Sequence, residues 1–158
     1  MKYFKISQYG SGSIVTIPDI TEDELSNAYR VIARQIDDPK DKEFLNFYEK
    51  PYPAISRKLK NALRPYLPEV IGIPVSLTNR PLELIVIYWL LNLGLVENQG
   101  IGTSGELVMK LDDINNSSKK LFKTRIGLRE YVIADFDVVE VILRNSIKDI
   151  QFTEITVI

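Results

Sequence analysis

The strongest constraint on this chain of 158 residues is a pattern that occurs twice: a short apolar strand, a small polar cap, a short amphipathic helix and a β-branched strand. The first copy comprises residues 54–55, the cap Ser56, residues 57–64 and residues 70–77; the second comprises residues 131–134, 135–144 and 150–158. Short helices between strands, with no linker rich in Pro, Gly or Ser, predict one α+β domain over residues 1–158. We expect a mostly antiparallel or mixed sheet, about three short helices and a repeated strand-helix-strand unit.

Composition narrows the possible functions. The 20 basic and 21 acidic side chains give a net charge of -1, which provides no global attraction to nucleic acid or anionic lipid. The chain has no cysteine and no histidine. Thiol chemistry is therefore excluded, and both the usual general base near neutral pH and the commonest metal ligand are missing. We expect no catalytic residue, no metal site and no cofactor.

No segment has the length and apolar character expected of a membrane anchor. The longest apolar stretch, residues 82–96, contains Glu83 and Asn92 and is shorter than the roughly 20 residues of a membrane span. The N-terminal residues are charged and lack the long apolar run of a signal peptide. These features predict a cytoplasmic protein.

The N-terminal third predicts a hairpin followed by a helix. Residues 2–6 and 13–17 read as two strands around a Gly-rich turn. Thr21 and Glu24 then have the spacing of a capping box, and Ile20 and Leu25 have that of a hydrophobic staple. Apolar residues continue at helical spacing, so we predict a helix over residues 22–35. The positions that carry this periodicity are Leu25, Ala28, Tyr29, Ile32, Ala33 and Ile36.

In the middle of the chain the residue pattern fits more than one type of secondary structure. Residues 84–95 are apolar nearly throughout and fit a buried strand, a buried helix or a strand followed by a helix. Their β-branched and aromatic start favours a strand there. Residues 107–111 suggest a short strand, and the Asn and Ser residues at 115–118 suggest a loop. Residues 122–126 and 130–133 read as strands on either side of a turn at Gly127. The β-branched C-terminus should pair within a sheet.

The loop Gly100 to Gly105 matches the G-x-G-x-x-G pattern of dinucleotide-binding loops. That motif works where a strand leads directly into a helix whose N-terminus holds the pyrophosphate, with an acidic residue about 20 positions later. Residues 106–111 have no clear amphipathic pattern, and Asp112 and Asp113 come too early for the ribose contact. A plain surface loop is the favoured interpretation, and a small-ligand or nucleotide site is the alternative.

Clusters of charge offer one candidate surface. Arg57, Lys58, Lys60 and Arg64 lie on the outer side of the predicted helix over residues 57–64. A basic helix face can bind phosphates or an acidic protein. The alternative is that these side chains only contact water and bind no partner. The acidic pairs along the chain lack EF-hand spacing. No serine lies in a nucleophile elbow.

The layout of the first copy also carries a family resemblance. Residues 53–63, followed by Ile73-Pro74-Val75-Ser76-Leu77 and Tyr88-Trp89-Leu90-Leu91-Asn92, resemble the bacterial immunity proteins of polymorphic toxin systems, in particular immunity family eleven, long described as a domain of unknown function. Residues 121–123, 131–133, 135–144 and 150–155 match the C-terminal part of that pattern, so the resemblance covers residues 52–158. It implies a protein without enzymatic activity that binds and masks a cognate toxin.

The sequence therefore supports two hypotheses. The first is a cytoplasmic immunity-type protein that neutralises a toxin domain by binding it, with no nucleic-acid or membrane partner and with Arg57, Lys58, Lys60 and Arg64 as the contact. The second is a small-ligand or nucleotide-binding domain that uses the loop Gly100 to Gly105. An enzyme that relies on carboxylates or tyrosine is disfavoured because the chain has no histidine or cysteine.

Overall fold

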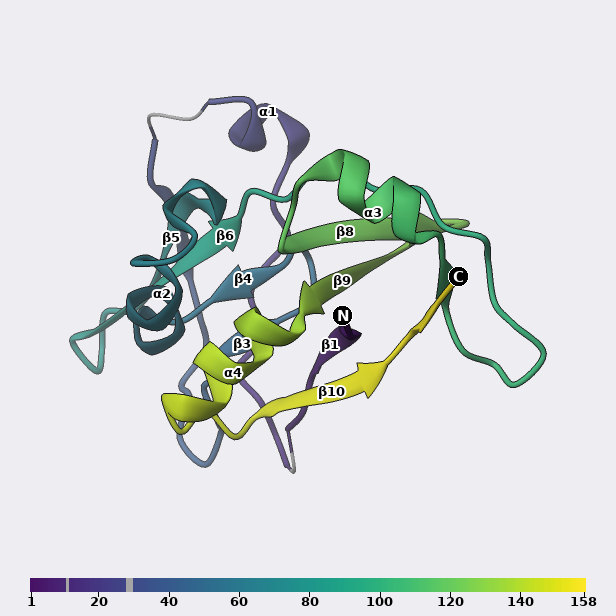
Figure 1. Ribbon diagram of the computed structural model, residues 1–158. Coiled ribbons are helices and arrows are strands. Elements are labelled where there is room, and N and C mark those ends of the chain that lie inside the picture. Colours follow the sequence, from purple (N-terminus) through teal and green to yellow (C-terminus); the bar gives the residue numbers. More distant parts are fainter. Residues whose placement is uncertain (11, 28–29) are drawn as a thin grey trace. The chain divides into compact units, whose positions relative to one another are not determined.

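Two principal sheets organise the chain in the computed structural model, which describes residues 1–10, 12–27 and 30–158 (Figure 1). The described residues form helices together with mixed and antiparallel sheets, so the predicted α+β class is confirmed. Contacts divide the chain into a central unit, residues 8–92 and 147–150, and a terminal unit, residues 1–7, 93–146 and 151–158. The single domain over residues 1–158 stays a prediction.

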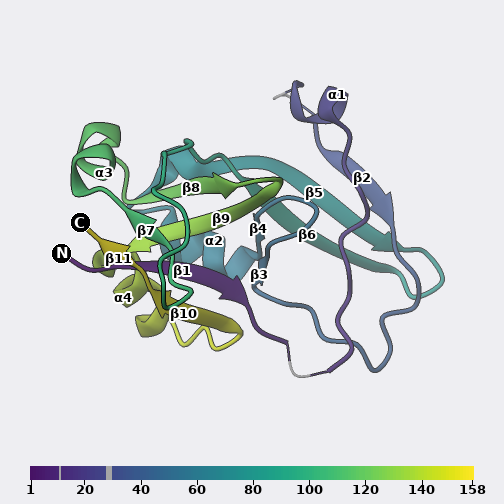
Figure 2. The ribbon, with the colours of Figure 1, turned by 90° about the vertical axis from the view of Figure 1, so that its right-hand side faces the viewer.

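The central unit contains a five-stranded mixed sheet in the order β2-β5-β6-β4-β3. Its strands are β2 (Ile32–Gln35), β3 (Phe47–Tyr48), β4 (Ala54–Ile55), β5 (Ile71–Asn79) and β6 (Leu84–Leu91). β5 and β6 form a long curved hairpin with β2 parallel to β5 at one edge (Figure 2). The apolar segment at residues 84–91 is therefore one strand, as its β-branched start suggested, and no helix follows directly.

The first copy of the repeated pattern folds as predicted. β4 leads to the cap Ser56, then to α2 (Arg57–Leu63), the 3-10 helix η1 (Pro68–Val70) and β5. The Ser56 hydroxyl accepts a hydrogen bond from the Leu59 N–H at 3.2 Å, as expected of an N-cap. β4 and β5 both pair antiparallel to β6, so they run parallel with β6 between them. This arrangement is a split β-α-β unit.

The terminal unit is built around a four-stranded sheet in the order β10-β1-β9-β8. These strands are β1 (Tyr3–Gln8), β8 (Leu121–Ile126), β9 (Arg129–Asp135) and β10 (Ile150–Glu154). A small parallel sheet joins β7 (Val108–Met109) to β11 (Thr156–Val157). The predicted strands around the Gly127 turn and the paired C-terminus are thus confirmed.

The second copy has the same connectivity. β9 leads through the cap Asp135 to α4 (Phe136–Arg144) and on to β10. The Asp135 carboxylate accepts from the Val138 N–H at 3.0 Å. β1 is antiparallel to β9, and backbone bonds from Tyr9 to Asp149 and from Ile155 to Tyr3 place β10 antiparallel to β1. β9 and β10 are therefore parallel, with β1 inserted between them.

Each unit has its own core. In the central unit the rings of Tyr48 and Tyr88 meet edge to face at 5.2 Å, and the Tyr88 hydroxyl donates to the Leu45 carbonyl at 2.6 Å. Burial raises the pKa of both tyrosines, so both stay protonated as hydrogen-bond donors. In the terminal unit the buried residues include Tyr3, Phe122 and Met109.

The prediction of a helix over residues 22–35 was wrong. The capping box does form, because Glu24 N–H donates to Thr21 Oγ1 and Thr21 N–H donates to Glu24 Oε1, but α1 spans only Glu22–Leu25. Ile32 begins the edge strand β2, whose register places Ile32 opposite Val75 in the core. Strand pairing with β5 therefore overrides the helical periodicity. Ala28 and Tyr29, which carried part of that periodicity, lie outside the described residues.

Two further predictions were also wrong. β1 does not form a hairpin with residues 13–17, because its partners are β9 and β10; Val15 and Ile17 are buried, and Ile14 makes only an isolated bridge to Glu43. The loop predicted at residues 115–118 is instead largely the end of α3 (Leu111–Ser117). The single buried residue Ile114 anchors that helix, and so its sequence shows little periodicity.

Candidate functional site

The basic residues predicted to form a contact surface lie on or beside α2. Leu59, Ala62 and Leu63 are buried. Arg57, Lys58 and Arg64 are exposed, and Lys60 is half-buried. The spacing of Arg57, Lys60 and Arg64 places these three on one side of the helix, whereas Lys58 lies about 100° away from Arg57.

The sole tryptophan of the chain lies beneath two of these cations. Trp89 belongs to β6, and its neighbours Tyr88 and Leu90 point into the core, so the alternation of a strand turns Trp89 toward the opposite face. Lys60 Nζ lies 3.9 Å from the centre of the Trp89 ring, and the Arg57 guanidinium carbon lies 5.9 Å from it. We call Arg57, Lys60 and Trp89 the Trp89 cluster.

The cluster holds positive charge at a defined place. Both cations lie within the distance at which a tryptophan ring attracts a positive charge. Among the described residues, no carboxylate lies within ion-pair distance of either Arg57 or Lys60. The ring therefore orients the two side chains while their charges stay available to a partner.

A polar network fixes the start of α2. The Ser56 hydroxyl donates to Asn46 Oδ1 at 2.6 Å, and the backbone N–H of Ser56 donates to the Asn46 carbonyl at 2.9 Å. Asn46 in turn donates its backbone and side-chain N–H groups to the carboxylate of Asp149, at 2.6 and 3.1 Å. The N-terminus of the basic helix is thus tied to two other segments of the central unit.

The sequence interpretation missed Trp89 as a site residue. The signal was present as a lone tryptophan out of phase with Tyr88 and Leu90 in a strand, preceded along the chain by a basic helix. Recognising the cluster required knowing that β4 and β6 pair, because that pairing brings α2 over β6.

The glycine-rich loop is a hairpin and does not lead into a helix. Gly102 N–H donates to the Glu106 carbonyl at 2.7 Å, and Val108 N–H donates to the Gly100 carbonyl at 2.9 Å. The next helix, α3, begins only at Leu111. A dinucleotide loop needs a helix N-terminus at this point, so the geometry differs from that of the motif.

A carboxylate also occupies the inner side of this hairpin. A Cβ atom at Gly102 would lie 2.2 Å from Glu106 Oε1, so the absence of a side chain at Gly102 makes room for Glu106. Glu106 Oε2 is buried and has no hydrogen-bond partner in the described part of the chain. The Glu106 side chain, and not an open phosphate cradle, therefore lies beside Gly102.

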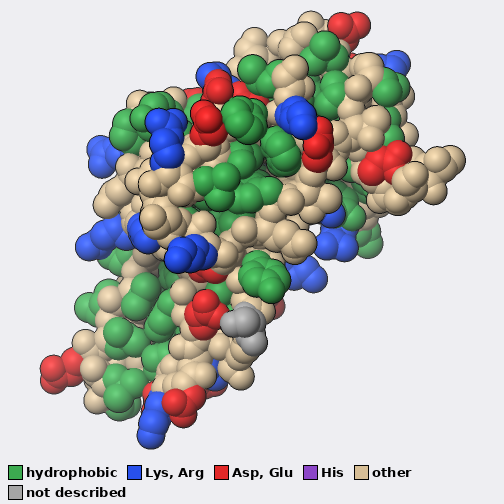
Figure 3. Space-filling view, turned by 60° about the horizontal axis from the view of Figure 1, so that its bottom comes forward, with side chains coloured by type: hydrophobic (Ala, Val, Ile, Leu, Met, Phe, Trp, Pro, Cys, Tyr) green, Lys and Arg blue, Asp and Glu red, His purple; other side chains and the backbone are tan. Residues whose placement is uncertain are grey.

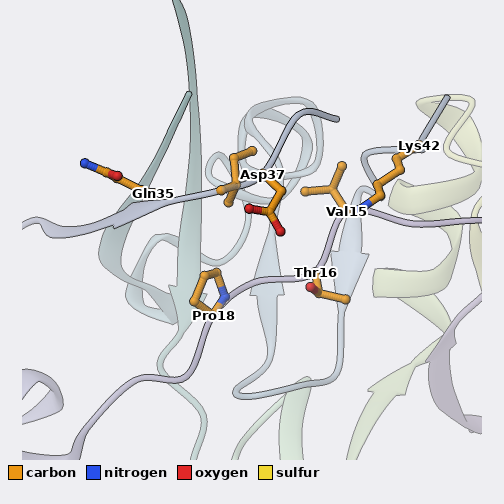
Figure 4. A pocket seen from close by; sticks show the side chains of 7 residues that line it. Val15, Thr16, Pro18, Gln35, Asp37 and Lys42 are labelled. Carbon is orange, nitrogen blue, oxygen red and sulfur yellow. The ribbon is translucent and has the colours of Figure 1, made fainter. Parts of the chain in front are cut away.

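A small pocket in the central unit lies beside the end of β2 (Figure 4). Its volume is about 130 Å³, and its lining residues are Val15, Thr16, Pro18, Gln35, Ile36, Asp37 and Lys42. The Asp37 carboxylate faces Thr16 and Pro18, whereas the Gln35 amide points away. Ordinary ligand pockets measure roughly 300–1,000 Å³, so this one is small for an organic ligand.

Two further requirements concern the described residues, those of a metal site and those of a membrane span. Across residues 1–10, 12–27 and 30–158, no three acidic side chains are grouped to hold a metal ion. Over the same residues, every helix falls short of the length and apolar character needed to cross a membrane.

No protein-family model, curated protein or solved structure matches the chain. The resemblance to immunity proteins therefore stays a hypothesis drawn from the sequence. The candidate site is defined by the geometry of the Trp89 cluster alone.

Proposed function

We propose that this chain is a non-enzymatic, cytoplasmic immunity-type protein that binds and neutralises a cognate toxin domain. The observation that supports this proposal most directly is the Trp89 cluster, in which Lys60 Nζ lies 3.9 Å from the ring centre and carries a charge that no described carboxylate pairs. Tryptophan and arginine are the residues most enriched at the energetic centres of protein interfaces. The cluster provides both.

The charge of the surface indicates the partner's chemistry. α2 contains no acidic residue; Arg57 and Lys60 lie on one of its sides, and Arg64 is its C-cap. Complementary charge speeds association and favours the correct partner. The toxin surface that binds here is therefore expected to be acidic, and inhibition is expected to result from occlusion or distortion of the toxin's active site.

Binding to the protein encoded by the gene directly upstream, which the proposal predicts to contain the toxin domain, tests the proposal. Wild-type protein should form a tight one-to-one complex and show no turnover. Reversing Arg57, Lys58, Lys60 and Arg64 to Glu should slow association by about tenfold or more, with a much smaller change in melting temperature.

A matched control reverses four other exposed cations, Lys110, Lys119, Arg144 and Lys148, and gives the same net charge. This control should associate at close to the wild-type rate. Equal slowing in both variants would show that net charge alone matters and that the α2 surface is merely solvated. If the wild type does not bind the toxin domain, the immunity proposal itself fails.

A further inference from the structure

The face of the five-stranded sheet that carries Trp89 extends beyond α2. Ile85, Ile87 and Trp89 alternate with core residues along β6 and so share this face. Two rows of residues run across β6, β5 and β2 on this face. The first row is Ile87, Ser76 and Ala33, and the second row is Ile85, Thr78 and Gln35. We call these two cross-strand rows the open face. Its six members are Ala33, Gln35, Ser76, Thr78, Ile85 and Ile87.

Half of the open face is exposed in the described part of the central unit, whereas Ser76, Thr78 and Ile87 are half-buried. Ile85 is 68% exposed, and Ala33 and Gln35 are exposed as well. On the other side of the same hairpin, Leu77 and Tyr88 are fully buried. α2 therefore covers one end of this face, where Ile55 is buried opposite Trp89, and leaves the two rows open.

The composition of the open face is unusual for a solvated one. Antiparallel sheets with one wet face ordinarily place polar residues on that face. Here two isoleucines reach it, and the next residue of β6 on the same face is Trp89, over whose ring the α2 cations Arg57 and Lys60 lie. Figure 3 shows one face of the molecule, on which hydrophobic side chains reach the surface between basic and acidic side chains.

We propose that the open face and the Trp89 cluster form one continuous docking surface, and that its occupant is an acidic surface of the toxin domain. The occupant places an apolar side chain over Ile85 and Ile87 and carboxylates against Arg57 and Lys60. This inference depends on the proposed function, because it specifies how the same partner binds.

The charges favour an acidic partner over a second copy of this chain. None of the six residues of the open face is charged, and the charged members of the cluster are both basic. In a symmetric dimer each copy presents the same patch to the other. Two such patches would bring together four cations and no carboxylate. An acidic protein supplies the missing charge.

Ala33 is the best position for a test, because it is exposed, has a small side chain and lies at the edge of the open face. Ala33→Glu places a negative charge on the surface, and Ala33→Lys places a positive charge of similar size there. Leu128→Glu, at an exposed turn of the terminal unit, serves as the control. Trp89 is the only tryptophan, so 5-fluorotryptophan labelling gives one fluorine signal within the surface itself.

The probe is the protein encoded by the gene directly upstream, which the proposed function predicts to contain the toxin domain. Wild-type binding should shift the fluorine signal; Ala33→Glu should weaken binding by about tenfold, and Ala33→Lys and Leu128→Glu by no more than about twofold. Melting temperatures of the variants should match that of the wild type. Ile85→Thr, which keeps a β-branched side chain but removes apolar area, should also weaken binding.

Several outcomes overturn the inference. If the wild type binds but neither Ala33→Glu nor Ile85→Thr changes affinity, the open face is not part of the surface, although the proposed function stands. Equal losses for Ala33→Glu and Ala33→Lys contradict an acidic occupant. A wild-type dimer that Ile85→Thr dissociates identifies a second copy as the occupant. A wild type that does not bind the toxin domain overturns both this inference and the proposed function.

Discussion

The central and terminal units contain the same split β-α-β connection, but the middle strand has a different origin in each. In the central unit β6 follows β5 through a tight turn, so the hairpin forms from neighbouring residues. In the terminal unit the middle strand is β1, far along the chain from both β9 and β10. The sheet of the terminal unit is therefore complete only when the N-terminal strand β1 pairs with β9 and β10.

The helices of the two repeats also differ. α4 buries Val138, Val139, Val141 and Ile142 and carries both acidic and basic residues outward. α2 buries three residues, carries only basic charge outward and holds two of its cations over a tryptophan. The same local arrangement thus provides structural support in one unit and a candidate binding surface in the other.

The largest expected effect comes from removing the strands that close the terminal unit. A chain ending at residue 149 loses β10 and β11, including the buried side chains of Ile150 and Ile155. Each buried side chain contributes about 1.5–3 kcal/mol, and whole domains are stable by only about 5–15 kcal/mol. We expect cooperative melting of the terminal unit to disappear in circular dichroism.

Deleting residues 1–7 provides a comparison with this truncation, because it removes most of β1 from between β9 and β10. It should abolish melting of the same unit. A cooperative melt of that unit in residues 1–149 would show that β10 is not required.

The next largest effect is expected at the cap of α2. Ser56→Ala removes both the acceptor for Leu59 N–H and the hydroxyl that donates to Asn46. The loss of a cap and of one further hydrogen bond should lower the free energy of unfolding by about 1–2 kcal/mol. Urea denaturation measures this change. Ser56→Thr, which keeps the hydroxyl, is the control and should recover most of the stability.

Two carboxylates should respond to pH in opposite directions. The hydrogen bond from Arg34 lowers the pKa of Glu24 from 4.5 to about 2, so its contribution to stability is present above pH 4.5 and is lost as the pH falls toward 2. Burial raises the pKa of Asp135, so its contribution is present at acid pH and is lost as the pH rises through the folded-state pKa.

Urea midpoints measured across pH for Glu24→Gln and Asp135→Asn separate these two effects. The amount by which the urea midpoint of Glu24→Gln lies below that of the wild type should decrease toward pH 2. Asp135→Asn should gain stability relative to the wild type as the pH rises from about 3 to 7. If both differences change in the same direction, the environments assigned to these carboxylates are wrong.

The smallest expected effect is at the first helix. Thr21→Ala breaks the capping box, but α1 is a single turn, so the free energy of unfolding should fall by about 0.5–1 kcal/mol. The toxin affinity should not change, because α1 lies outside the proposed surface. An unchanged urea midpoint would show that the box contributes nothing in solution.

Local signals in the sequence predicted both repeats well. The caps Ser56 and Asp135 precede short amphipathic helices that are flanked by β-branched strands, and these features depend only on neighbouring residues. The same reasoning failed at Ile32, because apolar spacing cannot distinguish a continued helix from an edge strand that pairs parallel to β5.

Features formed by distant residues were not predictable in the same way. β1 alternates like the strand of a hairpin, but its partners lie more than a hundred residues away. The basic residues of the candidate site were identified because they lie on one short helix. Trp89 was missed as their partner because only the pairing of β4 with β6 brings the tryptophan beneath α2.

The central claim is that the first repeat binds the toxin and that the second repeat supports the fold. Growth of cells that express the toxin domain tests this claim directly, using two variants with two altered charges each: Arg57→Glu with Lys60→Glu on α2, and Glu140→Lys with Arg144→Glu on α4. All four side chains are at least partly exposed, so both variants are expected to fold. We predict that the α4 variant protects cells as the wild type does and that the α2 variant does not. Full protection by the α2 variant, at an expression level equal to that of the wild type, would contradict the claim.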